Sequence, residues 1–140
     1  MAFTGNYSCN TLRSGLANGT INFATDPFRL ALYTNAATLD QTTTEYTPVG
    51  EATGGNYSPT GLLVTATIIS EATPTGSITY VNFSSPAWTG AITARGALIY
   101  TPGANGAVCV LDFGANKTST TSFTVQMPAN TSTSALIRLV

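Results

Sequence analysis

The amino-acid sequence predicts an all-β protein: a single-domain antiparallel β-sandwich, jelly-roll-like, with one short N-terminal helix. Its 140 residues are about the length of one domain. Seven short segments place apolar residues at the two-residue period of strands, and clusters rich in Gly, Pro, Thr, Ser and Asn separate them. Short, evenly spaced strands are typical of sandwiches and barrels. The predicted strands are residues 28–33, 62–69, 77–83, 92–100, 107–113, 122–127 and 135–140.

Turn-forming residues mark where the predicted strands end. Pro and Gly fix or free the backbone at a reversal, and Asn, Ser and Thr bond to it locally. Such residues dominate the connections that follow four of the strands. These predicted turns are TPTG at 73–76, TPGANG at 101–106, GANKTSTT at 114–121 and PANTSTS at 128–134.

The N-terminal part of the chain predicts the helix. Within residues 9–18, Leu12 and Leu16 are four residues apart, Asn10 or Thr11 is available as an N-cap, and Gly19 is available beyond the end.

The domain division follows from composition. Residues 1–10 are expected to form a polar, flexible N-terminal arm, and residues 11–140 a single sandwich domain. That domain contains a long polar loop at about 35–59, rich in Gly and Thr and too long for a plain connection. We therefore expect surface function in this loop.

Composition excludes several classes of partner. Hydrophobic residues make up 43% of the chain and charged residues only 8%, with a formal net charge of -1. Five cations are too few to neutralise several phosphates, so no nucleic-acid partner is expected. No apolar run is long enough to cross a bilayer, and the first residues lack the basic and apolar regions of a leader. The chain is accordingly expected to act away from membranes, after synthesis in a cytosol.

Residues suited to catalysis are sparse. The sequence has no histidine, which removes the commonest proton shuttle and metal ligand. Its six carboxylates are scattered singly, without the paired arrangement that a glycosidase requires. Asp40, Glu45 and Glu51 share the long loop but lack the spacing of a calcium loop, and no glycine-rich stretch matches a phosphate loop. We expect no enzyme activity, no cofactor and no metal.

Arg95 stands in the middle of the apolar strand 92–100, neither face of which is cleanly polar. Both faces are therefore expected to be covered. An unpaired guanidinium there would cost several kcal/mol, so Arg95 needs a carboxylate or several carbonyls as partners. Asp112, on the next predicted strand, is the first candidate for a structural ion pair.

Two cysteines and one tryptophan leave alternatives open. Cys109 stands between Val108 and Val110, which favours a small buried hydrophobe, although a disulfide with Cys9 is also possible. Trp88 is either buried in the core under a turn or an exposed ring for contact with sugar or protein, and the core is favoured.

Three stretches, taken together, resemble a family of small structural proteins encoded among the virion genes of tailed bacteriophages. They are NGTINFATDPFRLALYT near the start, WTGAITARGALIY in the middle and VCVLDFGANKTSTTSFTVQM near the end. The likeness spans nearly the whole chain, and its motifs are distinctive as a set rather than singly. The resemblance implies that TAR and DFG share one structural core, and it brings no active site. The family often has a bulky residue after the arginine, whereas this chain has Gly96. The glycine is expected to leave room beside Arg95 and so to alter the packing of its side chain.

The resemblance implies a virion component, with capsid decoration (cement) fitting best. A near-zero net charge agrees, since many copies can then lie side by side without long-range repulsion. The expected partners are the major capsid protein and the chain itself, as a homodimer or homotrimer, on the capsid surface of a virion assembled in the host cytoplasm. Candidate interface residues are Phe3, Tyr7, Tyr46 and Tyr57. A tail- or fibre-associated structural or carbohydrate-binding adhesion module is the alternative.

Overall fold

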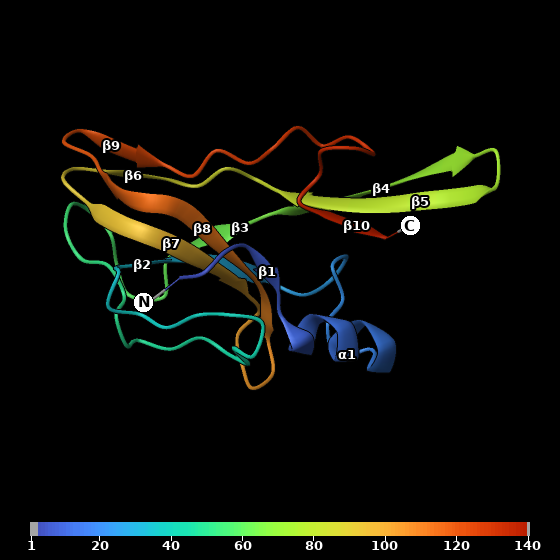
Figure 1. Ribbon diagram of the computed structural model, residues 1–140, viewed down its shortest axis with the longest axis horizontal. Helices are drawn as coiled ribbons and strands as arrows, with labels where there is room; N and C mark the ends of the chain where they lie inside the picture. Colours follow the sequence, from blue (N-terminus) through green and yellow to red (C-terminus); the bar gives the residue numbers. More distant parts are fainter. Residues whose placement is uncertain (1–2, 140) are drawn as a thin grey trace.

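The computed structural model describes residues 3–139, and it confirms an all-β, sandwich-like domain with one short helix (Figure 1). The elements, in chain order, are β1 (Tyr7–Ser8), α1 (Asn10–Asn18), β2 (Phe28–Tyr33), β3 (Leu62–Val64), β4 (Ala66–Thr73), β5 (Gly76–Phe83), β6 (Ala87–Thr89), β7 (Thr93–Tyr100), β8 (Ala107–Thr118), β9 (Ser122–Thr124) and β10 (Ile137–Leu139). They form a five-stranded sheet in the order β1-β8-β7-β2-β3, a three-stranded sheet in the order β10-β5-β4, and the β6-β9 pair. Every pairing is antiparallel.

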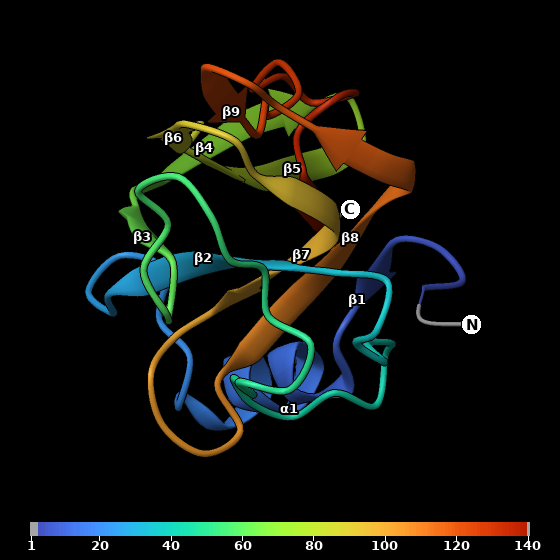
Figure 2. The same ribbon diagram turned by 90° about the vertical axis from the view of Figure 1, so that its left-hand side faces the viewer.

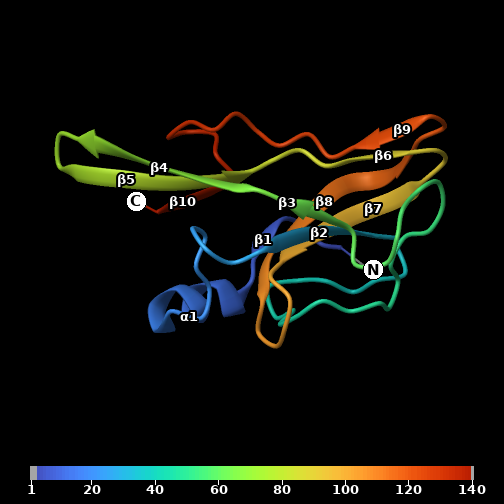
Figure 3. The same ribbon diagram turned by 180° about the vertical axis from the view of Figure 1, so that it is seen from behind.

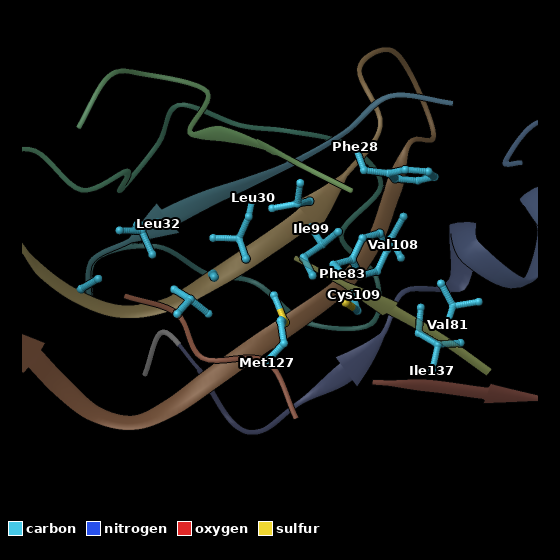
Figure 4. Close-up of a cluster of buried hydrophobic side chains, with 14 of the residues drawn as sticks. Phe28, Leu30, Leu32, Val81, Phe83, Ile99, Val108, Cys109, Met127 and Ile137 are labelled. Atoms are coloured by element: carbon cyan, nitrogen blue, oxygen red, sulfur yellow. The ribbon is translucent and has the colours of Figure 1, made fainter. Parts of the chain in front are cut away.

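The two smaller sheets cover one face of the five-stranded sheet. Phe28, Leu30 and Leu32 point from β2 toward this layer, and Phe83 of β5 packs against Phe28 with ring centroids 5.5 Å apart (Figure 4). Val81 of β5 lies farther along, beside Ile137 of β10. Trp88 of β6 and Phe123 of β9 extend the same cluster. Trp88 is buried, which confirms the core interpretation of that ring.

A long loop, residues 34–61, covers the opposite face with its first part; we call it the covering loop. Its later part turns round the sheet, so that Ala52 and Tyr57 join the cluster between the sheets. Its first part runs beneath β2 and β7 in Figure 1, and Figure 2 shows its green later part rising toward β6 and then passing to β3. Leu39 of this loop packs in one cluster with Tyr33, Leu98 and Val110, which the alternation of strand side chains places on the second face of the sheet. Burial on both faces explains why the central strands are apolar along their length, and it confirms that both faces of strand 92–100 are covered.

The cap of the helix lies one residue before the first of the two predicted cap positions, Asn10 and Thr11. Cys9, in an extended conformation, is the N-cap, and no side chain caps the helix. The first helical N–H, that of Asn10, donates instead to the carbonyl oxygen of Gln41 at 2.8 Å. Thr11 lies inside the helix, and its hydroxyl donates a 2.6 Å hydrogen bond to the carbonyl oxygen of Ala107, which ties the helix to β8. Gly19 ends the helix in the left-handed region, as predicted.

Several strand boundaries differ from the prediction: predicted strands 122–127 and 135–140 are shorter in the structure, β6 lies outside the predicted strands, and two further differences concern the sheet connections. The segment 62–69 divides at Thr65, because the chain passes there from the five-stranded to the three-stranded sheet, and β4 continues to Thr73. Residues 114–118, predicted as part of a turn, continue β8. Their pairing with β7 shifts register between Ala94 and Gly96, an irregularity that the left-handed backbone of Gly114 accommodates.

The N-terminal arm is packed onto the domain from residue 3 onward, which corrects the expectation of a free, flexible arm. Tyr7 pairs with Val110, and Phe3 is fully buried. The ring of Phe3 lies over Gly96, where an added Cβ would come within 2.5 Å of it. The missing side chain at position 96 thus makes room for Phe3. Residues 1 and 2 of the predicted arm lie outside the described residues.

The two cysteines are both free and buried. They belong to different hydrophobic clusters, Cys109 to the one between the sheets and Cys9 to the one under the covering loop. Burial raises the pKa of Cys9 to about 12 and also raises the pKa of Cys109. Both side chains therefore act as small hydrophobes in this structure.

Replacing Phe3 by alanine tests whether the arm is part of the core. We expect Phe3→Ala to lower the free energy of unfolding by about 3 kcal/mol, since it removes a buried ring and leaves a cavity. Thr4→Ala, at an exposed neighbouring position, is the control: it loses only a solvent-exposed hydroxyl contact with Tyr7 and should change stability by less than about 0.5 kcal/mol. Urea denaturation measures both variants. Equal stabilities would mean that the ring is free to serve as an exposed contact.

Candidate interaction surface

Arg95 and Asp112 form the predicted ion pair. Arg95 Nε donates to Asp112 Oδ1 at 2.9 Å, and Nη2 lies 3.4 Å from Oδ2, a two-pronged arrangement. Asp112 Oδ1 also accepts the Gly114 N–H, and the Asp112 N–H donates to Asn6 Oδ1. The hydrogen bond from Arg95 holds the pKa of Asp112 below its usual value. The ion pair therefore holds β7 to β8 where their register shifts, and the bond from the Asp112 N–H to Asn6 ties this point to the N-terminal arm.

Glu51 organises the covering loop. Its Oε1 accepts the Tyr46 hydroxyl at 2.5 Å, and its Oε2 accepts the Tyr57 hydroxyl at 2.5 Å and the Thr60 N–H at 2.9 Å. The Tyr57 hydroxyl also accepts the N–H of Leu32. Burial and the hydrogen bond to Glu51 raise the pKa of Tyr46 to about 12 and raise that of Tyr57. One carboxylate therefore links three points of the loop, and through Tyr57 it reaches strand β2.

The four predicted interface residues are mostly engaged within the chain. Phe3 is buried, which leaves it no exposed surface in this conformation. Tyr46 is half-buried and stacks on Tyr100, with ring centroids 5.2 Å apart, while the half-buried Tyr57 packs against Trp88. Tyr7 is also half-buried and shares a hydrogen bond with the hydroxyl of Thr4. The tyrosines of the loop act mainly as cover for the sheet, a role that their position in a polar loop did not suggest.

Hollows in the surface hold few ionisable groups. One of about 460 Å³ is lined by Phe113, Phe123 and Lys117, and another of about 310 Å³ by Arg29, Tyr46, Tyr100 and Glu45, among others. Arg29 is held there by the carbonyl oxygens of Thr60 and Gly61. Over residues 3–139, no group of three or more His, Cys, Asp or Glu side chains could hold a metal ion.

Strands β3 and β4 form an uncovered sheet edge, residues 62–73, which we call the open edge. β3 is the last strand of its sheet and β4 the last of the other, and the two follow one another along the molecule (Figure 3). Leu62, Leu63 and Ile68 are 37%, 64% and 43% exposed. Glu71 is the one charged residue in this segment, which has no Lys, Arg or Pro. Charged residues, Lys above all, and Pro normally protect an exposed sheet edge from pairing with another strand.

Sequence reasoning identified this segment as a strand but not as an edge. The signal present in the sequence is the run LLVTATII, which places apolar side chains on both faces of the strand. The structure places this segment at the edge of its sheets and not in the middle. Strand order, which determines whether such a strand is enclosed or exposed, depends on distant segments. The open edge is the candidate interaction surface.

Removing Arg95 tests the ion pair. We expect Arg95→Met to lower the free energy of unfolding at neutral pH by about 1–3 kcal/mol, because it leaves Asp112 without its main partner. The lowered pKa of Asp112 contributes stability that is present above its unfolded pKa and is lost as pH falls through its folded pKa. In the variant this loss at acid pH should become smaller. Urea titrations between pH 2 and 7 measure this loss of stability. Arg13→Met, at an exposed arginine, is the control. An unchanged dependence of stability on acid pH in Arg95→Met would contradict the assignment.

Removing Glu51 tests the covering loop. Glu51→Ala leaves the hydroxyls of Tyr46 and Tyr57 and the Thr60 N–H without their shared acceptor. We expect a loss of about 3 kcal/mol in unfolding free energy, with faster amide exchange over residues 34–61. The matched control is Glu45→Ala, an exposed carboxylate of the same loop, which should change stability by less than about 0.5 kcal/mol. Similar effects of the two substitutions would show that Glu51 is not the organising residue.

Comparisons complete the description of the chain. Within the described residues, no helix is long and apolar enough to cross a membrane. Comparison with family models, with curated proteins and with solved structures finds no match for this chain. A function must therefore be argued from the open edge, the covered faces and the distribution of charge.

Proposed function

We propose that this chain is a non-enzymatic structural protein of a bacteriophage virion, a decoration (cement) protein that binds the outer capsid lattice and stabilises it. The open edge is the observation that carries the proposal. Its β3 half presents Leu62 and Leu63, on a segment with a single charge. Exposed apolar groups beside an unpaired sheet edge suit contact with another protein.

The rest of the molecule supports a role that depends on shape. Both faces of the five-stranded sheet are filled by side chains of the chain itself. The ion pair holds β7 to β8, and the Glu51 hydrogen bonds hold the covering loop in one arrangement. A rigid block of this kind can bridge lattice subunits with little loss of conformational freedom on binding.

Charge supports a role in many copies. The net charge of -1 gives little long-range repulsion between neighbouring copies. Weak contacts to several capsid subunits add up when copies associate, since later contacts form at high effective concentration. The major capsid protein and the chain itself are the partners in this proposal.

A second candidate is a carbohydrate-binding module of a tail or fibre. The hollow lined by Arg29, Tyr46 and Tyr100 favours it, since aromatic rings and charged groups often line sites for polar ligands. Tyr100 is nearly fully buried, however, and the hydroxyls of both tyrosines are already bonded within the chain. Selective binding on a glycan array that Tyr46→Ala abolishes would support this candidate.

Adding the purified chain to capsids that lack it tests the proposal. We expect binding to the capsid surface, visible in particle images, and greater resistance of the particles to heat. Leu63→Lys should weaken this binding by about tenfold or more, because it places a charge in an apolar contact. Val49→Lys is the matched control, since Val49 is 70% exposed but lies in the covering loop away from the open edge, and it should bind like the unmodified chain. Absence of binding, or equal loss in both variants, would overturn the proposal.

A further inference from the structure

We infer that two copies of this chain pair through β4, antiparallel, so that two three-stranded sheets join into one continuous sheet. This inference stands apart from capsid binding, because it concerns the β4 half of the open edge alone. β4 has eight residues and pairs only with β5. At a rise of about 3.4 Å per residue it offers an edge roughly 27 Å long.

The register of the β4–β5 hairpin determines which backbone groups are free. Thr73 pairs with Gly76 across a two-residue turn, and the residues that flank such a turn exchange hydrogen bonds. Odd-numbered residues of β4 therefore direct their N–H and C=O groups to β5. The same alternation continues at Thr65, whose carbonyl oxygen accepts the N–H of Ser84. Even-numbered residues, Ile68, Ser70 and Ala72 among them, turn their backbone groups outward.

The outward groups are accessible to a second chain. Beyond Ala66 and Ile69, which are half-buried, every residue of β4 is exposed. The hairpin extends past α1 and past the rest of the chain at that end of the molecule (Figures 1 and 3). The carboxylate of Glu71 accepts the Tyr80 hydroxyl from the adjacent strand at 2.9 Å, so this charge is held within the hairpin. Nothing on the β4 edge opposes pairing.

Charge and residue pattern make a second copy the fitting occupant. Antiparallel pairing of β4 with itself about Ser70 places Glu71 opposite Ile69 of the other copy, and pairing about Ile69 places it opposite Thr67. Neither register brings the two acids together. Ile68 then lies opposite Ala72 or Ser70 of the other copy, in reach of small side chains. Such twofold contacts, with one patch used by both subunits, are the commonest in soluble oligomers.

Proline at position 70 tests the pairing. The Ser70 N–H points outward, so Ser70→Pro removes a donor of the dimer contact while sparing the bonds to β5. We expect the unmodified chain to sediment as a dimer and Ser70→Pro to dissociate about tenfold or more readily. Ser70→Ala is the matched control: it loses the hydroxyl contact with Thr79 but keeps the N–H, and should remain dimeric. A dimer that persists in Ser70→Pro would overturn the inference.

A cross-linking measurement covers the case in which the proline variant does not fold. Both native cysteines are buried, so an introduced cysteine is the reactive thiol. Ser70→Cys should form a disulfide-linked dimer on mild oxidation, whereas Ser122→Cys, exposed on β9, should not. An unmodified chain that stays monomeric at 100 µM, with no cross-link at position 70, would contradict the inference.

Dimers that do not bind capsids would refute the capsid role alone, and capsid binding by a monomer would refute the pairing alone.

Discussion

The fold depends on covering both faces of the five-stranded sheet. Its central strands are apolar on each face, so a sandwich partner on one side is not enough. The small sheets fill one side with Phe83, Trp88 and Phe123, and the covering loop with the arm fills the other with Leu39 and Phe3. A loop used as a layer has backbone groups that no sheet ladder satisfies. Backbone bonds such as Thr34 N–H to the Gly50 carbonyl and Ala52 N–H to the Leu32 carbonyl meet part of this demand. Glu51 adds a bond to the Thr60 N–H and fixes the hydroxyls of Tyr46 and Tyr57, which is why one acid in a polar loop matters to the whole structure.

Charged residues are few, and several of them are bonded inside the chain. Arg95 and Asp112 bond to each other, Arg29 donates to the carbonyls of Thr60 and Gly61, and Glu51 accepts from two tyrosines. The exterior is consequently left with Thr, Ser, Asn and few free charges. A surface of this kind has weak long-range fields, which favours close packing of identical copies over recognition of a strongly charged partner.

The sequence predicts best where local pattern and burial agree. Strand 28–33 is found with its predicted bounds because it is an interior strand of a sheet buried on both faces. The Arg95–Asp112 pair could be anticipated because a lone charge in a covered strand needs a partner. The burial of Phe3 could not, since the space for its ring is created by Gly96, more than ninety positions away. The hydrogen bonds of Tyr46 and Tyr57 to Glu51 cannot be predicted from the sequence either, because loop spacing does not specify side-chain direction, and a polar loop favours surface contact for both rings.

The open edge gives the two proposals a shared physical basis. A long edge strand without Lys, Arg or Pro is a hazard for a protein that stays alone, since its outward N–H and C=O groups can pair with any extended chain. Glu71, the one charge present, bonds to Tyr80. The two halves differ in what they present: β3 offers the exposed leucine side chains and β4 a row of backbone groups beside small side chains. Side-chain contact suits a fixed lattice partner, and strand pairing suits an identical copy, so one edge can serve both without competition.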